Sequence, residues 1–256
     1  GVGASVVNAL SEWLVVQVHH DGKIHEQRYS RGDVMAPLTV VGDTDITGTF
    51  VHFLPDAEIF EETVYEYDIL KQRFRETAFL TKGLKINLFD LREGIEQNHS
   101  FHYEGGIKEF VSYLNNSRTP LYENIFYATG EKDGVLVEVA FQHNDGFTES
   151  IFTFVNNINT PDGGTHLVGF KAGLTKTLND YGKKLGIIKD ADKKLSGEDV
   201  REGITAVVSI KVEDPQFEGQ TKAKLGTSEA KGAVESILSE YLTYFLEENP
   251  SIGKTI

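Results

Sequence analysis

A polar stretch near the end of the chain, DPQFEGQTKAKLGTSE (residues 214–229), combines side chains that could hold an anion. It follows a strand pattern and precedes a helix pattern, so we expect a loop between the two. Gln220, Thr221 and Lys222 offer an amide, a hydroxyl and an ammonium in consecutive positions. Lys222 is a compact point charge that suits a terminal phosphate, and the Gln220 amide could donate to the same oxygen. The alternative is a solvated loop with ordinary surface lysines.

Two short patterns near the start of the chain could contribute to a site of the same kind. Gly1-Val2-Gly3 opens a helical pattern, and a helix N-terminus presents free N–H groups and a positive dipole to an anion. Thr49 and Val51 fall on one side of an expected strand, where a hydroxyl beside an apolar wall could read the edge of a flat heterocycle. On spacing alone, an ordinary helix start and an ordinary strand start account for these residues better.

The histidines do not form a recognisable catalytic or metal-binding pattern. Three lie around one expected hairpin and two lie in a polar stretch: His19, His20, His25, His99 and His102. None shows the i, i+4 helical spacing with a carboxylate that is typical of catalytic zinc sites. The sequence also contains neither a G-x-S-x-G elbow nor a G-x-x-x-x-G-K-[ST] loop, so it predicts no metal site, serine hydrolase or P-loop enzyme.

Composition narrows the class of protein further. The 256 residues carry a formal net charge of −14 and no cysteine, so disulfides and thiolate metal sites are excluded. Such an acidic chain is a poor candidate for wrapping nucleic acid by itself, because phosphate contacts require clusters of Lys and Arg. No apolar run approaches the length of a membrane span. Met35 is the only methionine and residue 1 is glycine, so we expect the chain to be a piece of something longer.

The hydrophobic periodicity of the first half predicts a helix, three strands, a second helix and a fourth strand. Val6, Val7, Leu10 and Leu14 share helical spacing, and Asp21-Gly22 is a strong hairpin signal because type I′ turns require positive φ. The expected strands cover residues 13–20, 23–32, 47–55 and 84–90, and the second helix covers residues 64–80. Residues 92–106 are polar and contain glycine, so they are the best candidate for a domain junction.

The second half of the chain also contains helix and strand patterns, in another order. A short helix (107–114) precedes a strand (134–142) whose Val135, Val137, Val139 and Phe141 share a face, with residues 149–157 as its expected hairpin partner. Gly163-Gly164 precede a helix bearing Leu167, Phe170, Leu174, Leu178 and Tyr181, and Ser196 with Asp199 form a predicted capping box. A buried strand (204–214) and a long final helix flank the polar loop. The fold class is therefore α+β, with two domains in series.

Six strings of the sequence, in order and with their spacings, resemble the DNA gyrase B family. They are GVGASVVNALS, TGTFVHF, FHYEGGIKEFV, NNINTPDGGTH, REGITAVVSIKV and DPQFEGQTKAKLGTSE, and they cover essentially the whole chain. The resemblance implies the C-terminal part of a GHKL (Bergerat) ATPase α/β sandwich over residues 1–101. A transducer domain of ribosomal-protein-like α+β fold would follow over residues 102–256.

The resemblance also assigns roles to the candidate residues. Gly1, Val2 and Gly3 would end the glycine-rich ATP lid, Thr49 would help to fix adenine, and Val51 would stand in its wall. Gln220 and Lys222 would act as catalytic residues that reach across the domain boundary to the γ-phosphate. His20 stands where the family usually carries an arginine that contacts coumarin inhibitors.

The family's catalytic glutamate, adenine-binding aspartate, Mg²⁺-ligating asparagine and N-terminal dimer arm would precede this chain. We therefore expect the fragment alone to hydrolyse ATP poorly or not at all.

As a function, the resemblance implies the subunit that binds and hydrolyses ATP in a cytoplasmic type II DNA topoisomerase. ATP with Mg²⁺ would drive closure of a gate made by two B subunits, which is coupled to DNA strand passage and negative supercoiling. DNA and the gyrase A subunit would be partners, without a membrane. Two alternatives stay open: the B subunit of topoisomerase IV, which relaxes and decatenates DNA, and a transducer-like scaffold without catalysis. A third, a GHKL protein outside the topoisomerases, is disfavoured by the strings HYEGG and EGQTKAKLG.

Overall fold

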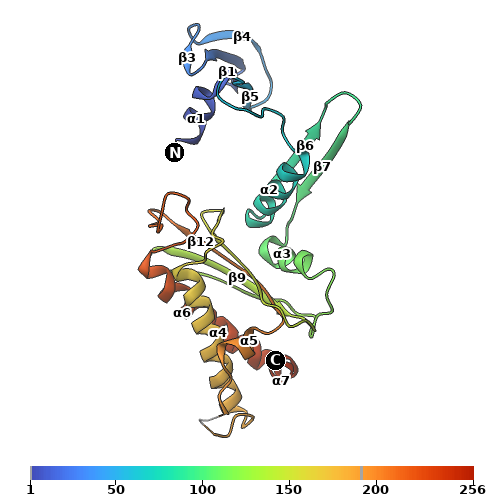
Figure 1. Ribbon diagram of the computed structural model, residues 1–256, viewed down its shortest axis with the longest axis vertical. Coiled ribbons are helices and arrows are strands. Elements are labelled where there is room, and N and C mark those ends of the chain that lie inside the picture. The colour runs from blue at the N-terminus through green and yellow to red at the C-terminus, as the bar shows by residue number, and fades with distance from the viewer. Residues whose placement is uncertain (1, 191–192) are drawn as a thin grey trace. The chain divides into compact units, whose positions relative to one another are not determined.

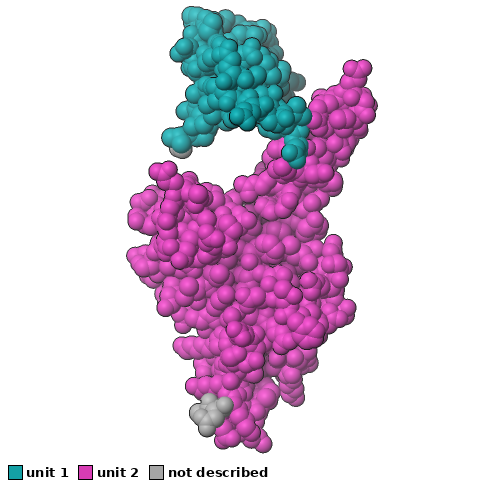
Figure 2. Space-filling model, in the orientation of Figure 1, with its two compact units in different colours: residues 1–66 teal, residues 67–256 magenta. Residues whose placement is uncertain are grey.

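The structure, a computed structural model, describes residues 2–190 and 193–256. The chain divides into two compact units, residues 1–66 and residues 67–256 (Figure 2). Each unit has its own sheet, and each is described by itself below. No helix in the described part of the chain combines the length and the hydropathy that a membrane span requires.

The first unit is a short helix followed by a twisted antiparallel sheet (Figure 1). The sheet has the strand order β3-β2-β1-β5, and β4 also pairs with β2. The elements are α1 (Gly3–Ala9), β1 (Ser11–His20), β2 (Lys23–Ser30), β3 (Asp33–Val34), β4 (Thr39–Asp43) and β5 (Gly48–Pro55). Leu14, which shares the helical spacing of Val6, Val7 and Leu10 but also falls in the predicted strand 13–20, lies in β1, where it pairs with Phe53 of β5 and is 4% exposed. Its burial in the sheet outweighs its helical spacing.

The hairpin between β1 and β2 is confirmed. Asp21 and Gly22 have φ values of 49° and 75°, and His20 pairs with Lys23 across them. This is the two-residue turn with positive φ that fits the right-handed twist of adjacent strands. The turn sets the register of β1 against β2, and β5 pairs with the other edge of β1.

The second unit begins with α2 (Tyr67–Leu80), a hairpin of β6 (Lys85–Asp90) and β7 (Gln97–His102), and α3 (Gly106–Leu114). Phe79 joins the two helices, since its ring stacks on Tyr103 at a centroid distance of 3.7 Å and on Phe110 at 4.6 Å. The polar stretch 92–106 contains β7, the second strand of the hairpin. The compact division falls at 66/67, whereas the domain boundary at 101/102 stays a prediction.

A five-stranded mixed sheet with the order β11-β10-β12-β9-β8 forms the centre of the second unit. Its strands are β8 (Phe126–Lys132), β9 (Val135–His143), β10 (Ser150–Val155), β11 (Ile158–Asn159) and β12 (Ile204–Val212). Residues 149–157 are not the hairpin partner of β9. That partner is β8, and β10 instead pairs in parallel with β12. A period-two pattern fixes the faces of a strand but not its neighbour.

Helices cover both faces of this sheet. The long helices α4 (Thr165–Lys184) and α6 (Ser228–Glu248) pack side by side on one face (Figure 1), and the predicted apolar stripe of α4 is confirmed. The same core contains the four alternating residues of β9, all at most 1% exposed: Val135, Val137, Val139 and Phe141. On the opposite face, Ala140 and Val207 pack with α3 and the end of α2.

Two short helices complete the second unit, α5 (Gly197–Arg201) and α7 (Pro250–Thr255). The capping box predicted for α5 is confirmed. The Asp199 N–H donates to Ser196 Oγ at 3.1 Å, and the Ser196 N–H donates to Asp199 Oδ2 at 2.7 Å. The mixture of helices and strands predicted from the sequence is confirmed in both units.

Candidate functional site

The loop that joins β12 to α6, residues 213–227, folds as a narrow hairpin. Its two sides meet at Phe217 and Leu225, which form an antiparallel bridge. At the tip, the Lys222 N–H donates to the carbonyl oxygen of Gly219 at 3.3 Å. The predicted loop is thus confirmed, and its tip is a defined turn.

The two lysines near this tip have different surroundings. Lys224 Nζ lies 3.0 Å from Glu218 Oε2, so its charge is neutralised across the hairpin. Lys222 is exposed and, among the described residues, its ammonium forms no ion pair. Its backbone is left-handed, with φ at 56°, which a lysine rarely adopts. Gln220 is exposed on the same turn. The tip therefore presents one free ammonium beside one amide donor, which is a suitable pair for an oxyanion.

Thr49 and Val51 lie on one face of β5, as the alternation predicted. The strand register places Thr49 opposite Val18 of β1 and Val51 opposite Val16. Val51 is 51% exposed and Val18 is 37% exposed, so they form an open apolar strip with a hydroxyl at its end. Phe50 lies on the other face. This arrangement could receive a flat apolar group, and the role of Thr49 and Val51 stays a prediction.

Of the residues predicted for the start of the site, Gly1 lies outside the described residues. Val2 precedes α1 and is 76% exposed, and Gly3 is the first residue of that helix. An added Cβ at Gly3 would meet no atom within 4 Å, so nothing in the first unit requires glycine there for space. A role of Val2 and Gly3 in phosphate binding stays a prediction.

The predicted site residues fall in two groups by unit. Thr49 and Val51 are neighbours on the first sheet, and Gln220 and Lys222 are neighbours on the loop of the second unit. Across residues 2–190 and 193–256, no three His, Cys, Asp or Glu side chains are grouped so that they could hold a metal ion.

Sequence reasoning missed a buried histidine close to the loop. His166 is fully buried in the first turn of α4, and its Nε2 lies 3.0 Å from Thr160 Oγ1. Thr160 in turn bonds to Thr153 of β10, with its Oγ1 donating to the Thr153 carbonyl at 3.0 Å. Burial lowers the pKa of His166 to about 4, because the charged imidazolium would lose its hydration. The apolar spacing around this histidine was the only signal that it is a core residue.

The buried imidazole gives a prediction for stability against pH. An unfolded histidine titrates near pH 6.5 and His166 near pH 4, so between these values only the unfolded chain binds the proton. Stability therefore falls as the pH falls from 6.5 to 4, by up to about 3 kcal/mol from this group. Urea unfolding of His166→Gln against pH should show a shallower loss. The surface variant His20→Gln should keep the parental slope, and an equal flattening in both would contradict the assignment.

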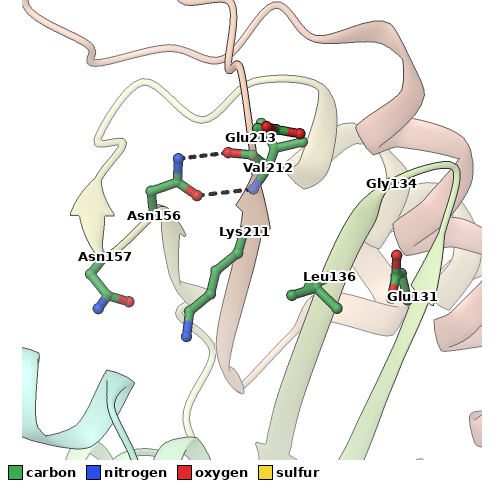
Figure 3. A pocket seen from close by; sticks show the side chains of 8 residues that line it. All are labelled: Glu131, Gly134, Leu136, Asn156, Asn157, Lys211, Val212 and Glu213. Atoms are coloured by element: carbon green, nitrogen blue, oxygen red, sulfur yellow. Dashed lines mark hydrogen bonds between the residues drawn. The ribbon is translucent and has the colours of Figure 1, made fainter. Parts of the chain in front are cut away.

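A groove of about 500 Å³ lies beside the base of the loop (Figure 3). It is lined by Glu131, Gly134, Leu136, Asn156, Asn157, Lys211, Val212 and Glu213. At its rim, the Asn156 side chain bonds to Val212 twice, with Nδ2 donating to the carbonyl at 2.8 Å and Oδ1 accepting from the N–H at 2.9 Å. The groove thus adjoins the residue from which the loop departs.

Comparison with known proteins supports one family. The sequence model of the family described as DNA gyrase B matches residues 106–256. The chain is 57% identical over 257 residues to the B subunit of DNA gyrase from Bacillus mycoides, covering all of this chain and 63% of that protein. It is 52% identical over 260 residues to the B subunit of DNA topoisomerase 4 from Staphylococcus epidermidis, covering 39% of that protein.

A solved structure agrees with the sequence relatives. The 43K ATPase domain of Thermus thermophilus gyrase B, solved in complex with an aminocoumarin, superimposes with a TM-score of 0.89 at 44% sequence identity. The match covers 99% of this chain and 69% of that one. The chain spans less than two thirds of the length of the curated relatives, 63% of the Bacillus protein and 39% of the Staphylococcus protein. The family model, which covers more than half of the chain, shows that the protein belongs to the DNA gyrase B family.

Proposed function

We propose that this chain is part of the subunit that binds and hydrolyses ATP in a type II DNA topoisomerase, DNA gyrase. ATP binding would close a gate formed by two B subunits, and this closure would be coupled to DNA strand passage and negative supercoiling. DNA and the gyrase A subunit are the proposed partners. The observation that carries the proposal is the tip of the 213–227 loop, which presents the free ammonium of Lys222 in a chain of the DNA gyrase B family.

In this proposal, Lys222 and Gln220 bind the γ-phosphate of ATP. The positive charge of Lys222 stabilises negative charge that develops on the phosphoryl oxygens during transfer, and Gln220 donates an N–H to one of them. Lys224 is a weaker candidate, because Glu218 already neutralises it. Thr49 and Val51 would contact adenine, and Gly1, Val2 and Gly3 would cradle the phosphates.

The chemistry of these residues also suggests how ATP could act as a switch. A cation that contacts only the γ-phosphate binds ATP and not ADP, so the arrangement that it stabilises would persist until hydrolysis and phosphate release. The free ammonium and the neighbouring amide fit an anionic ligand. The described residues offer no comparable cluster for Mg²⁺, so no step of the proposal passes through the metal.

The B subunit of topoisomerase IV is the second candidate. It is favoured by the 52% identity to the Staphylococcus epidermidis protein of that name. The loop chemistry serves both enzymes equally, because both candidates would use the γ-phosphate. Supercoiling and decatenation assays on the complete enzyme would separate them.

Amine labelling tests the proposed phosphate contact directly. In the complete protein, a saturating non-hydrolysable ATP analogue should slow acetylation of Lys222 by about tenfold or more, because only the unbound fraction reacts. ADP should give little protection, since it lacks the γ-phosphate. Lys211 serves as an exposed reference lysine on β12, and its labelling rate should not change. Equal labelling of Lys222 with and without the analogue would contradict the proposal and favour a scaffold without catalysis.

A further inference from the structure

The returning side of the 213–227 loop is bonded to the segment that leads into α4. We call this segment, residues 160–166, the strap. The Leu225 N–H donates to the Gly163 carbonyl at 3.0 Å, and the Thr165 N–H donates to the Leu225 carbonyl at 3.1 Å. The Asp162 N–H also donates to the Ala223 carbonyl at 3.0 Å. Leu225 is fully buried, so its side chain and both of its backbone groups are fixed.

Gly164 makes this close pairing possible. A Cβ built at Gly164 would lie 2.5 Å from the Leu225 nitrogen and 2.8 Å from its Cα, far inside van der Waals contact. The glycine also has φ at 137°, which side chains rarely adopt. These neighbours are backbone atoms, so they cannot rotate away. Any side chain at this position must separate the strap from the loop.

Hydrogen bonds to buried residues fix the strap in place. His166 and Thr160 bond to each other at 3.0 Å, and the Gly163 N–H donates to the Thr160 carbonyl at 2.9 Å. Thr165 Oγ1 adds a bond to the Thr227 carbonyl at 2.6 Å, next to the start of α6. The strap is therefore a fixed support to which the loop is attached.

The departing side of the loop has its own support (Figure 3). Asn156 lies in the two-residue turn between β10 and β11 and has φ at 49°, so its side chain can reach across to β12. Its two bonds to Val212 tie β12 to the end of β10 beyond their last ladder pair, Val155 with Ile210. Val212 is the last residue of β12, so the loop starts from a fixed point.

Both ends of the loop are thus attached, and only two residues, Ala223 and Lys224, separate Leu225 from Lys222. Over so short a distance, a shift of the support moves the tip, because one residue spans at most about 3.5 Å. A misplacement of about 1 Å at a reacting group can cost about 100-fold in rate. We propose that Gly164 and Asn156 are positioning residues that hold Lys222 where it meets the terminal phosphate. This inference rests on the proposed function of Lys222.

A double-mutant cycle in the complete protein tests whether Gly164 positions Lys222. Gly164→Ala should lower the kcat of ATP turnover by about 10- to 100-fold. Amide hydrogen exchange of residues 223–227 should become faster in the same variant. In a Lys222→Ala background, Gly164→Ala should add little further loss, because both changes act through the same ammonium. Gly232→Ala is the matched control, since Gly232 is exposed on α6 and an added Cβ meets nothing within 4 Å.

A milder pair of variants covers the case in which Gly164→Ala fails to fold. Asn156→Gly keeps the left-handed backbone and removes both bonds to Val212, so it should also lower kcat and speed exchange at the base of the loop. Asn157→Gly is its control, because Asn157 has φ at 64° and bonds to Thr81 instead.

The possible outcomes distinguish the positioning role of Gly164 and Asn156 from the proposed function of Lys222. Unchanged exchange in residues 223–227 of Gly164→Ala, or a loss of turnover that is just as large in the Lys222→Ala background, would overturn the positioning role. Turnover near the parental rate in Lys222→Ala alone would instead contradict the proposed function, while faster exchange would still show that the strap holds the loop.

Discussion

Replacing Lys222 with alanine in the complete protein lowers ATP turnover by at least about 100-fold, if this ammonium stabilises charge on the transferred phosphoryl group. Affinity for a non-hydrolysable ATP analogue should fall as well, whereas affinity for ADP should not change. The fold should be unaffected, because the side chain is exposed and forms no ion pair among the described residues. Steady-state turnover and calorimetry with both nucleotides measure these effects.

Lys224→Ala is the control for charge. It removes a lysine from the same hairpin, two residues away, but one that Glu218 already pairs with. An exposed ion pair of this kind contributes at most about 1 kcal/mol, so turnover should stay close to the parental rate. Lys222→Arg should retain part of the activity, because it keeps the charge but changes its geometry. If Lys222→Ala and Lys224→Ala behaved alike, the loop would contribute only general positive charge.

Phe79→Ala is expected to destabilise the second unit strongly. Phe79 is 1% exposed and stacks between Tyr103 and Phe110, so its removal leaves a cavity where α2 meets α3. Truncation of a buried phenylalanine costs about 3–5 kcal/mol. Denaturant unfolding should show this loss, and hydrogen exchange should become faster along α2 because the helix loses its contact with Tyr103 and Phe110.

Ile69→Ala provides the comparison on the same helix. Ile69 lies on α2 but is 56% exposed, so its truncation should change stability by no more than about 0.5 kcal/mol. A loss in Ile69→Ala comparable to that in Phe79→Ala would mean that the ring stack does not determine how α2 is held.

The sequence predicted strand and helix faces well and strand partners poorly. Val137 and Val139 alternate in a way that only a buried sheet face explains, and both are buried. The partner of residues 149–157 could not be inferred, because the parallel pairing of β10 with β12 joins segments that are about fifty residues apart. Leu14 fitted both a helical spacing and the strand 13–20, and only its burial in the sheet decides between them.

At the candidate site, too, the sequence predicted side-chain chemistry but not the contacts between distant segments. Side-chain chemistry identified Gln220 and Lys222, because amide and ammonium groups are visible in a sequence. The attachment of the loop could not be seen, because it consists of backbone bonds to Gly163 and Thr165, and backbone groups are the same at every position. Gly163-Gly164 was interpreted only as a helix start. Its second property, the room it leaves for Leu225, depends on a segment about sixty residues further along.

The backbone angle of Lys222 bears on how such a loop could be engineered. Someone redesigning the chain for heat resistance alone would put glycine or asparagine at this position, since either tolerates its conformation better than lysine does. Either substitution would remove the ammonium of Lys222, the lysine at the hairpin tip that Glu218 does not pair with. Thermostability screens on this protein should therefore exclude position 222, because the most heat-resistant variants there would also have the lowest ATP turnover.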